Sequence, residues 1–254
     1  RAWFFCILLF IAVIFSQGLV SHAAVFHGVF GGIPHVLHLC AVSVWSGTLF
    51  MAGLYVPVER WNSFLTWFHP TAMLAMFVLV VSGLMLMVFT VPEYVRSWVL
   101  PFGQALLLKH LFLVPIFVFA FFHGWWMRKK IARKENFNPK PWVIAEAIFI
   151  LLIFAITGFM SQQPAPHDVS QALSDFSVSP LYAWLHGEIT EMTSFHWNFN
   201  SVSIISIGLS MLSLLYMIFS VFKTQRPLFA IVSGLVFAVF AFISAVSAIH
   251  IGVH

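Results

Sequence analysis

Charged residues are scarce in this 254-residue chain. Asp, Glu, Lys and Arg make up 8% of it, whereas hydrophobic residues make up 61%. A soluble domain carries roughly a quarter charged residues and about half apolar ones. The composition therefore excludes a soluble globular fold, a disordered chain and a nucleic-acid-binding module. Cysteine is scarce too, because Cys6 and Cys40 are the only two, too few for a disulfide framework.

Long apolar runs dominate the sequence instead. A bilayer core of about 30 Å needs roughly 20 mostly apolar residues in each helix. Seven stretches have this length, and polar or proline-containing tracts separate them. We therefore predict an all-α, polytopic membrane helix bundle of about seven transmembrane helices, forming a single integral membrane domain over residues 1–254. The stretches are about 2–20, 34–56, 68–90, 104–127, 142–160, 202–222 and 227–249.

The basic residues predict how the bundle is oriented. Six of the twelve Lys and Arg lie between residues 128 and 140, and loops rich in these residues face the cytoplasm. If successive spans cross the membrane in alternate directions from that loop, ten of the twelve Lys and Arg lie on the cytoplasmic side. The connection 161–201 contains Asp and Glu but neither Lys nor Arg. We predict that this connection and the C-terminus are extracytoplasmic.

Histidine is abundant, with twelve residues in a chain that has few other ionisable groups. Under the predicted topology, only His69 and His123 lie toward the cytoplasm, and the other ten lie on or near the outer face. Imidazole is the commonest metal ligand in proteins and suits copper, zinc and iron. The skew toward one face indicates metal binding there.

Spacing selects the strongest candidate ligands. His35 and His38 are three residues apart, so both rings lie on one face of a helix. His38 and His110 are expected at similar depths below the outer face, and His186 and His196 lie in the outer connection. The predicted metal ligands are therefore His35, His38, His110, His186 and His196. Weaker candidates are His22, His27, Glu188, Met192, His250, His254 and His123.

Two further charged residues fall within predicted spans. Lys109 precedes His110, and a cation at that depth is costly in lipid, so we expect it to face a cavity or a carboxylate. Glu146 lies about one turn inside the cytoplasmic end of its span, and we expect it to pair with the basic loop 128–140.

Three short motifs occur in order along the first two thirds of the chain. They are His35-Val36-Leu37-His38-Leu39 running to Trp45-Ser46-Gly47, then Leu106-Leu107-Leu108-Lys109, then Ser161-Gln162-Gln163-Pro164. Over about residues 33–165 the chain resembles the CopD copper-resistance family. The outer connection 166–201 and two additional transmembrane helices in 202–254 lie outside this CopD-like core.

The resemblance implies a multi-pass protein of the bacterial plasma (inner) membrane that handles copper. Such a protein is surrounded by membrane lipid and partnered by an extracytoplasmic copper carrier of the CopC type. It carries the ligand role over only to His35 and His38, with Lys109 as the other matched polar residue. No nucleic acid is expected as a partner.

Copper uptake through outer-face His and Met sites is the leading functional hypothesis, with the copper ion as cargo. The chain lacks a phosphate-binding Gly-x-x-x-x-Gly-Lys-Ser/Thr motif, so it is not by itself an ATP-driven pump. An alternative is a membrane oxidoreductase that binds haem b, with His38 and His110 as axial ligands. Two other roles stay open: a zinc-dependent membrane enzyme in which Glu188 or Glu191 acts as base, and a structural subunit.

Overall fold

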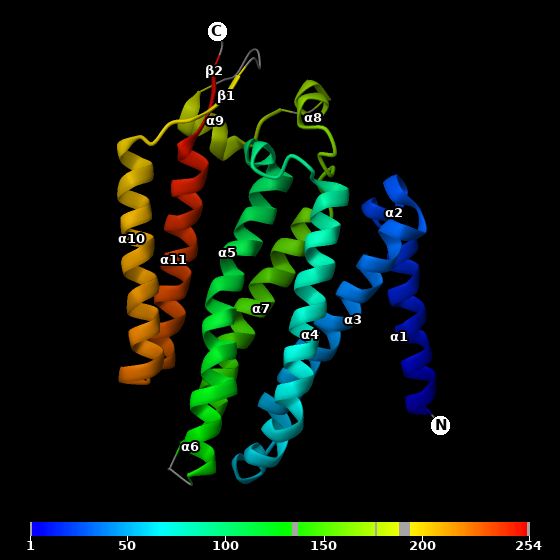
Figure 1. The fold of residues 1–254 in the computed structure, drawn as a ribbon, viewed down its shortest axis with the longest axis vertical. Helices are drawn as coiled ribbons and strands as arrows, with labels where there is room; N and C mark the ends of the chain where they lie inside the picture. Colours follow the sequence, from blue (N-terminus) through cyan, green and yellow to red (C-terminus); the bar gives the residue numbers. More distant parts are fainter. Residues whose placement is uncertain (1, 134–136, 176, 188–193, 253–254) are drawn as a thin grey trace. The chain divides into compact units, whose positions relative to one another are not determined.

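A computed structural model describes residues 2–133, 137–175, 177–187 and 194–252 (Figure 1). Helices dominate these residues, and six of them are long and apolar enough to cross a membrane. The prediction of an all-α polytopic bundle is thus confirmed. The chain divides into two compact units, Arg1–Pro92 and Glu93–His254.

The long helices agree with six of the seven predicted spans. The first predicted span forms α1 (Ala2–Leu19), an apolar helix of 18 residues. Its described apolar part, Trp3–Leu19, is shorter than the other six. Those six are Val29–Tyr55, Val58–Thr90, Pro101–Ile131, Lys140–Met160, Ser201–Thr224 and Pro227–Ala248.

The first unit is a pair of long helices, α3 and α4, with two shorter helices packed against α3. Close packing is possible because Gly31 has no side chain: a Cβ there would lie 1.9 Å from the carbonyl oxygen of Ala23. The short helix α2 is capped by Ser21, whose side chain accepts a hydrogen bond from the Ala24 amide in the first turn. Besides α1, the elements are α2 (His22–His27), α3 (Val29–Tyr55), η1 (Val58–Arg60) and α4 (Trp61–Thr90).

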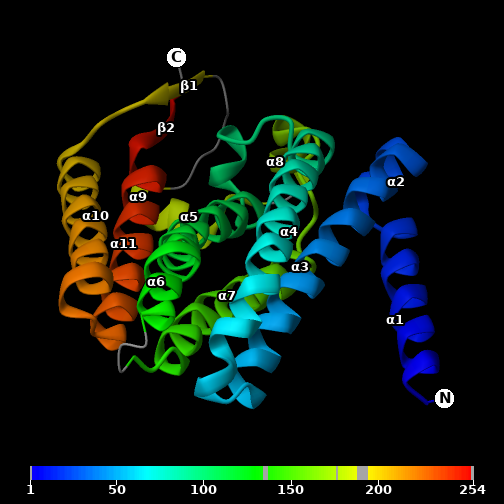
Figure 2. The ribbon, with the colours of Figure 1, turned by 60° about the horizontal axis from the view of Figure 1, so that its bottom comes forward.

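The second unit contains the other four long helices, in two pairs. Helix α5 packs on α7 and α10 packs on α11, while α11 also contacts α5 and α7 (Figure 2). Gly234 allows α11 to approach α7, because a Cβ there would lie 2.7 Å from Cζ of Phe149. The long elements are α5 (Pro101–Phe121), η3 (Phe122–Met127), α6 (Arg128–Ala132), α7 (Lys140–Met160), α10 (Ser201–Phe219), η4 (Ser220–Thr224) and α11 (Pro227–Ala248).

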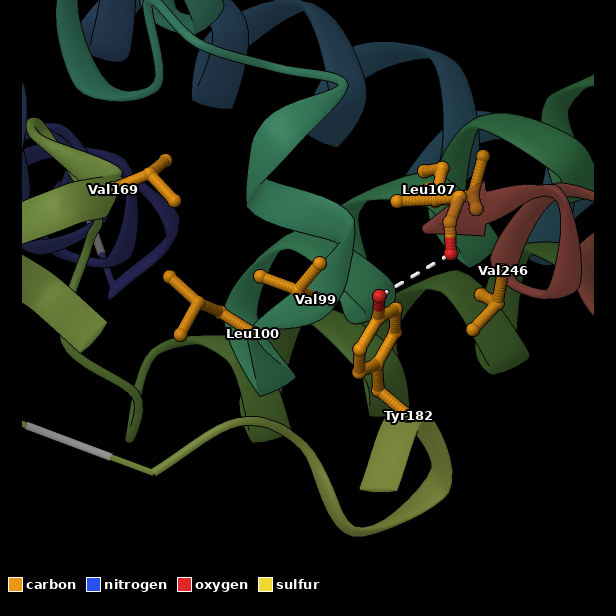
Figure 3. Close-up of a cluster of buried hydrophobic side chains, with 7 residues drawn as sticks. Val99, Leu100, Leu107, Val169, Tyr182 and Val246 are labelled. Carbon is orange, nitrogen blue, oxygen red and sulfur yellow. Dashed lines mark hydrogen bonds between the residues drawn. The ribbon is translucent and has the colours of Figure 1, made fainter. Parts of the chain in front are cut away.

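The predicted outer connection folds against one end of this second unit, where α5 begins and α11 ends (Figure 1). It contributes short helices and one strand of a two-stranded antiparallel ribbon. A buried apolar cluster of Val99, Leu100, Leu107, Val169, Tyr182, Val246 and Ile249 holds the end together (Figure 3). The short elements are η2 (Arg96–Val99), α8 (Val169–Asp175), α9 (Pro180–His186), β1 (Ser194–Trp197) and β2 (Ile249–Gly252).

Candidate metal sites

Two histidines approach each other at the end of the second unit that carries the β1–β2 ribbon, and a third lies across the ribbon from one of them. His186 ends α9 and His250 lies in β2, and their ring centroids are 4.8 Å apart at 76°. His196 of β1 stands directly opposite His250 in the ribbon register, so their Cβ atoms lie on the same side of the ribbon. The structure thus brings two predicted ligands, His186 and His196, to the same histidine, His250.

Tyr182 fixes the geometry of this cluster. Ser179 caps α9 by accepting a hydrogen bond from the Tyr182 amide, 3.1 Å away. The Tyr182 ring is completely buried and stacks on His186 at 4.5 Å between centroids. Its hydroxyl donates to the carbonyl of Ile249 at 3.2 Å (Figure 3). One side chain therefore ties the helix that carries His186 to the strand that carries His250.

The hydrogen bonding of His186 determines which nitrogen can bind a metal. Its Nε2 lies 3.1 Å from the carbonyl oxygen of Val246. A carbonyl only accepts hydrogen bonds, so Nε2 carries the proton and the lone pair lies on Nδ1. Metal-binding histidines are commonly oriented in this way, by donating the other ring N–H to a backbone carbonyl.

Burial lowers the pKa of His186, the hydrogen bond to Val246 opposes that shift, and the charge of His250 lowers the pKa further. A metal binds the neutral imidazole. This environment therefore keeps His186 in its ligand form to a lower pH than an exposed histidine.

The cluster at the ribbon end is a histidine pair with a third histidine across the ribbon. Over the described part of the chain, no group of three or more His, Cys, Asp or Glu side chains is close enough to hold a metal ion. Three of the weaker candidates, Glu188, Met192 and His254, lie outside the described residues, as does Glu191.

His38 in the first unit is held by the facing helix α4. Its Nδ1 lies 3.2 Å from Oγ of Ser82, and the Ser82 hydroxyl itself donates to the carbonyl of Val78 at 2.6 Å. Ser82 must therefore accept from His38, which places the ring proton on Nδ1 and the lone pair on Nε2. Gly83 leaves room for the ring, because a Cβ there would lie 3.2 Å from Cε1 of His38. His35 is half-buried one turn earlier on α3.

His110 in the second unit has a tyrosine partner. Its Nδ1 lies 2.8 Å from the hydroxyl oxygen of Tyr94, in the segment before α5. Burial raises the pKa of Tyr94 to about 12, so the phenol stays protonated at any physiological pH. The sequence predicts that His38 and His110 lie at similar depths below the outer face. The two residues belong to different units, so this stays a prediction.

The expectation for Glu146 was wrong. Among the residues that the structure describes, Glu146 pairs with His123 and not with the basic loop: its Oε2 lies 2.7 Å from Nδ1 of His123, inside the second unit. The reason is that the Glu146 side chain is buried, with 1% exposed, and a carboxylate at that depth pairs with the cation-forming group nearest to it in the bundle interior.

The weaker candidates His22 and His27 are exposed in the first unit, and the His27 ring contacts Phe89 at 4.6 Å.

The positioning residues had no recognisable signal in the sequence. Ser82, Tyr94 and the carbonyl of Val246 lie 44, 16 and 60 residues from the histidines they contact. None belongs to a motif with those histidines, and only the folded helices bring them together.

Six apolar spans, with histidines held between helices and at one end, define a multi-pass membrane protein with candidate metal sites. Residues 62–160 match the family CopD, copper resistance protein D. The resemblance is thereby confirmed for a segment that runs from the start of α4 to the end of α7. This segment contains Lys109, His110 and His123, but it begins after His38 and ends before His186. No curated protein and no solved structure matches the chain.

Proposed function

We propose that this protein takes up copper across the plasma membrane, using histidines at the outer face as the first ligands. The observation that carries the proposal is the His186–His250 pair, found at one end of a chain that contains a CopD segment. The ring of His186 is anchored through Nε2 and keeps its Nδ1 lone pair for a metal. Imidazole is a ligand that suits copper.

In this mechanism the ribbon end captures copper from an extracytoplasmic carrier of the CopC type. His186 and His250 receive the ion, and His196 is placed across the ribbon to assist. His35, His38 and His110 then accept it within the helix bundle. Sites with few strong ligands favour passage, because an ion that is held too tightly does not leave.

Copper accumulation in cells that express each variant tests the pathway. His38→Ala is expected to abolish copper-dependent accumulation, because it removes a ligand within the bundle. His186→Ala combined with His196→Ala is expected to weaken copper capture more than it slows translocation. His167→Ala is the matched control, since it removes an exposed histidine of the same connection that lies outside the proposed path. Normal copper uptake by the His38→Ala variant, at normal expression, would show that the proposed pathway is wrong.

Metal analysis and an absorption spectrum of the purified protein test the identity of the bound species. About one copper or more per chain without a Soret band is the expected result. A Soret band with bound iron would overturn the proposal in favour of the haem b alternative with His38 and His110. Nothing observed in the described residues favours that alternative.

A further inference from the structure

A buried polar contact in the second unit has no part in the outer-face path. His123 of η3 and Glu146 of α7 approach to 2.7 Å, and the two residues are 8% and 1% exposed. Ionisable groups inside an apolar span are costly and mark ion or proton pathways more often than ordinary packing. The pair therefore calls for a function.

The second ring nitrogen of His123 points to a ligand. Nε2 is buried and has no hydrogen-bond partner among the described residues. Nδ1 faces Oε2 of Glu146, which has no other polar partner among the described residues; in the tautomer with the ring proton on Nδ1, the lone pair lies on Nε2. A buried polar atom without a partner needs an explanation, and a histidine backed by a carboxylate is the arrangement that orients imidazoles toward metals.

A methionine lies on the same helical turn as His123. Met127 is four residues after His123 and is completely buried. Residues four apart share a helix face, and an imidazole with a thioether suits Cu(I). The turn itself, Phe122–Met127, is π-helical, a geometry that is frequent at functional sites.

The surroundings of His123 are aromatic. The rings of Phe119 and Phe122 lie 6.4 Å and 5.7 Å from the His123 ring, and Trp142 packs on Phe122 at 4.6 Å. This apolar shell keeps water away from the contact. A monovalent cation on the far nitrogen of the His123 ring would attract the Glu146 carboxylate through the ring, which lowers the cost of burying its charge.

We propose that His123 Nε2 and Met127 Sδ form a Cu(I) relay site inside the membrane, with Glu146 as the residue that positions His123. The inference rests on the proposed function for the identity of the cargo, but not on the outer histidine pair. It adds a further binding site to the proposed copper path, within the segment that matches the CopD family.

The test is an anaerobic Cu(I) titration of the purified chain against a chromophoric Cu(I) chelator, in a His186→Ala/His250→Ala background. The background protein is expected to bind Cu(I). Adding His123→Gln to it is expected to lower the number of bound Cu(I) ions by one per chain. Glu146→Gln is expected to weaken this site about 10–100-fold, as removal of a ligand-orienting group does. Met127→Leu is expected to abolish the copper–sulfur signal in X-ray absorption. Met217→Leu, which changes an equally buried methionine of α10, is expected to retain it.

A double variant, His123→Gln/Glu146→Gln, separates metal binding from packing. Two amides can hydrogen-bond where the imidazole and carboxylate met, so the fold is expected to persist, as judged by gel filtration and circular dichroism. If the folded double variant binds Cu(I) like its background, the relay site does not exist. The outer pair fails by a different result, namely equal copper stoichiometry in the parent and in His186→Ala/His250→Ala, so the two proposals fail independently.

Discussion

The Tyr182 hydroxyl tests how the proposed site of His186 and His250, called the outer pair here, is built. Tyr182→Phe removes a single oxygen atom. The phenyl ring still stacks on His186, but the carbonyl of Ile249 loses the donor that lies 3.2 Å away. Because β2 begins at Ile249, the next residue, His250, loses one of the contacts that fix its strand to α9.

The expected cost follows from burial. Tyr182 and Ile249 are both completely buried, so water cannot replace the lost donor. Leaving a buried acceptor unsatisfied costs about 1–3 kcal/mol. Tyr182→Ala also removes the ring from the apolar cluster and is expected to cost about 3–5 kcal/mol. The two variants therefore separate the hydrogen bond from the packing.

The assay is unfolding of the purified protein in detergent, combined with copper affinity for the outer pair. Tyr182→Phe is expected to bind copper roughly 10-fold more weakly, at the lower end of the effect of removing an orienting group. Tyr216→Phe is the matched control, because that tyrosine lies on α10 with 47% of its surface exposed. If Tyr182→Phe matches Tyr216→Phe in both stability and copper affinity, then Tyr182 does not position the site.

Two further predictions concern His186 and His38. Burial is the main cause that lowers the pKa of His186 in the folded state. The stability that neutral His186 contributes is therefore fully present above pH 6.5, the ordinary pKa of histidine. It is lost as the pH falls from there through the lowered pKa of the folded state. Unfolding measured from about pH 8 to pH 5 should show this loss in the parent and not in His186→Gln. Gly83→Ala, whose Cβ would press on the His38 ring at 3.2 Å, should reduce copper uptake several-fold, whereas Gly47→Ala, with nothing within 4 Å, should not. Equal uptake by the two glycine variants would refute a role for the His38 ring position.

The sequence was sufficient for the architecture because membrane burial leaves a long, one-dimensional signal. Each span must be apolar over about 20 residues, and six such helices form where they were expected. The proximity of His186 to His250, in contrast, could not be predicted from the sequence. It depends on the pairing of β1 with β2, and no alternation or turn signal in residues 194–197 or 249–252 predicted a ribbon.

The partners of buried polar groups were beyond sequence reasoning for a related reason. Glu146 was assigned to the basic loop because that loop is close in the chain and opposite in charge. The helical periodicity of an almost uniformly apolar span does not show which face is buried, so the approach of Glu146 to His123 could not be read from it. The π-helical turn that carries His123 is likewise indistinguishable in sequence from the apolar helix that surrounds it.

In the proposed copper path, the anchoring of the histidines limits how firmly an ion is held. His38 and His186 each donate one ring N–H to a fixed acceptor on another element, Ser82 Oγ or the Val246 carbonyl. In the proposed copper path, His186 then offers its Nδ1 to a metal in one orientation, and the His186–His250 pair offers two ring nitrogens. Structural metal sites are closed by four protein ligands, so a two-ligand site binds more weakly but loses its ion more readily. Rigid rings with few ligands thus combine selectivity for an imidazole-binding metal with rapid release, and this combination suits transport better than storage.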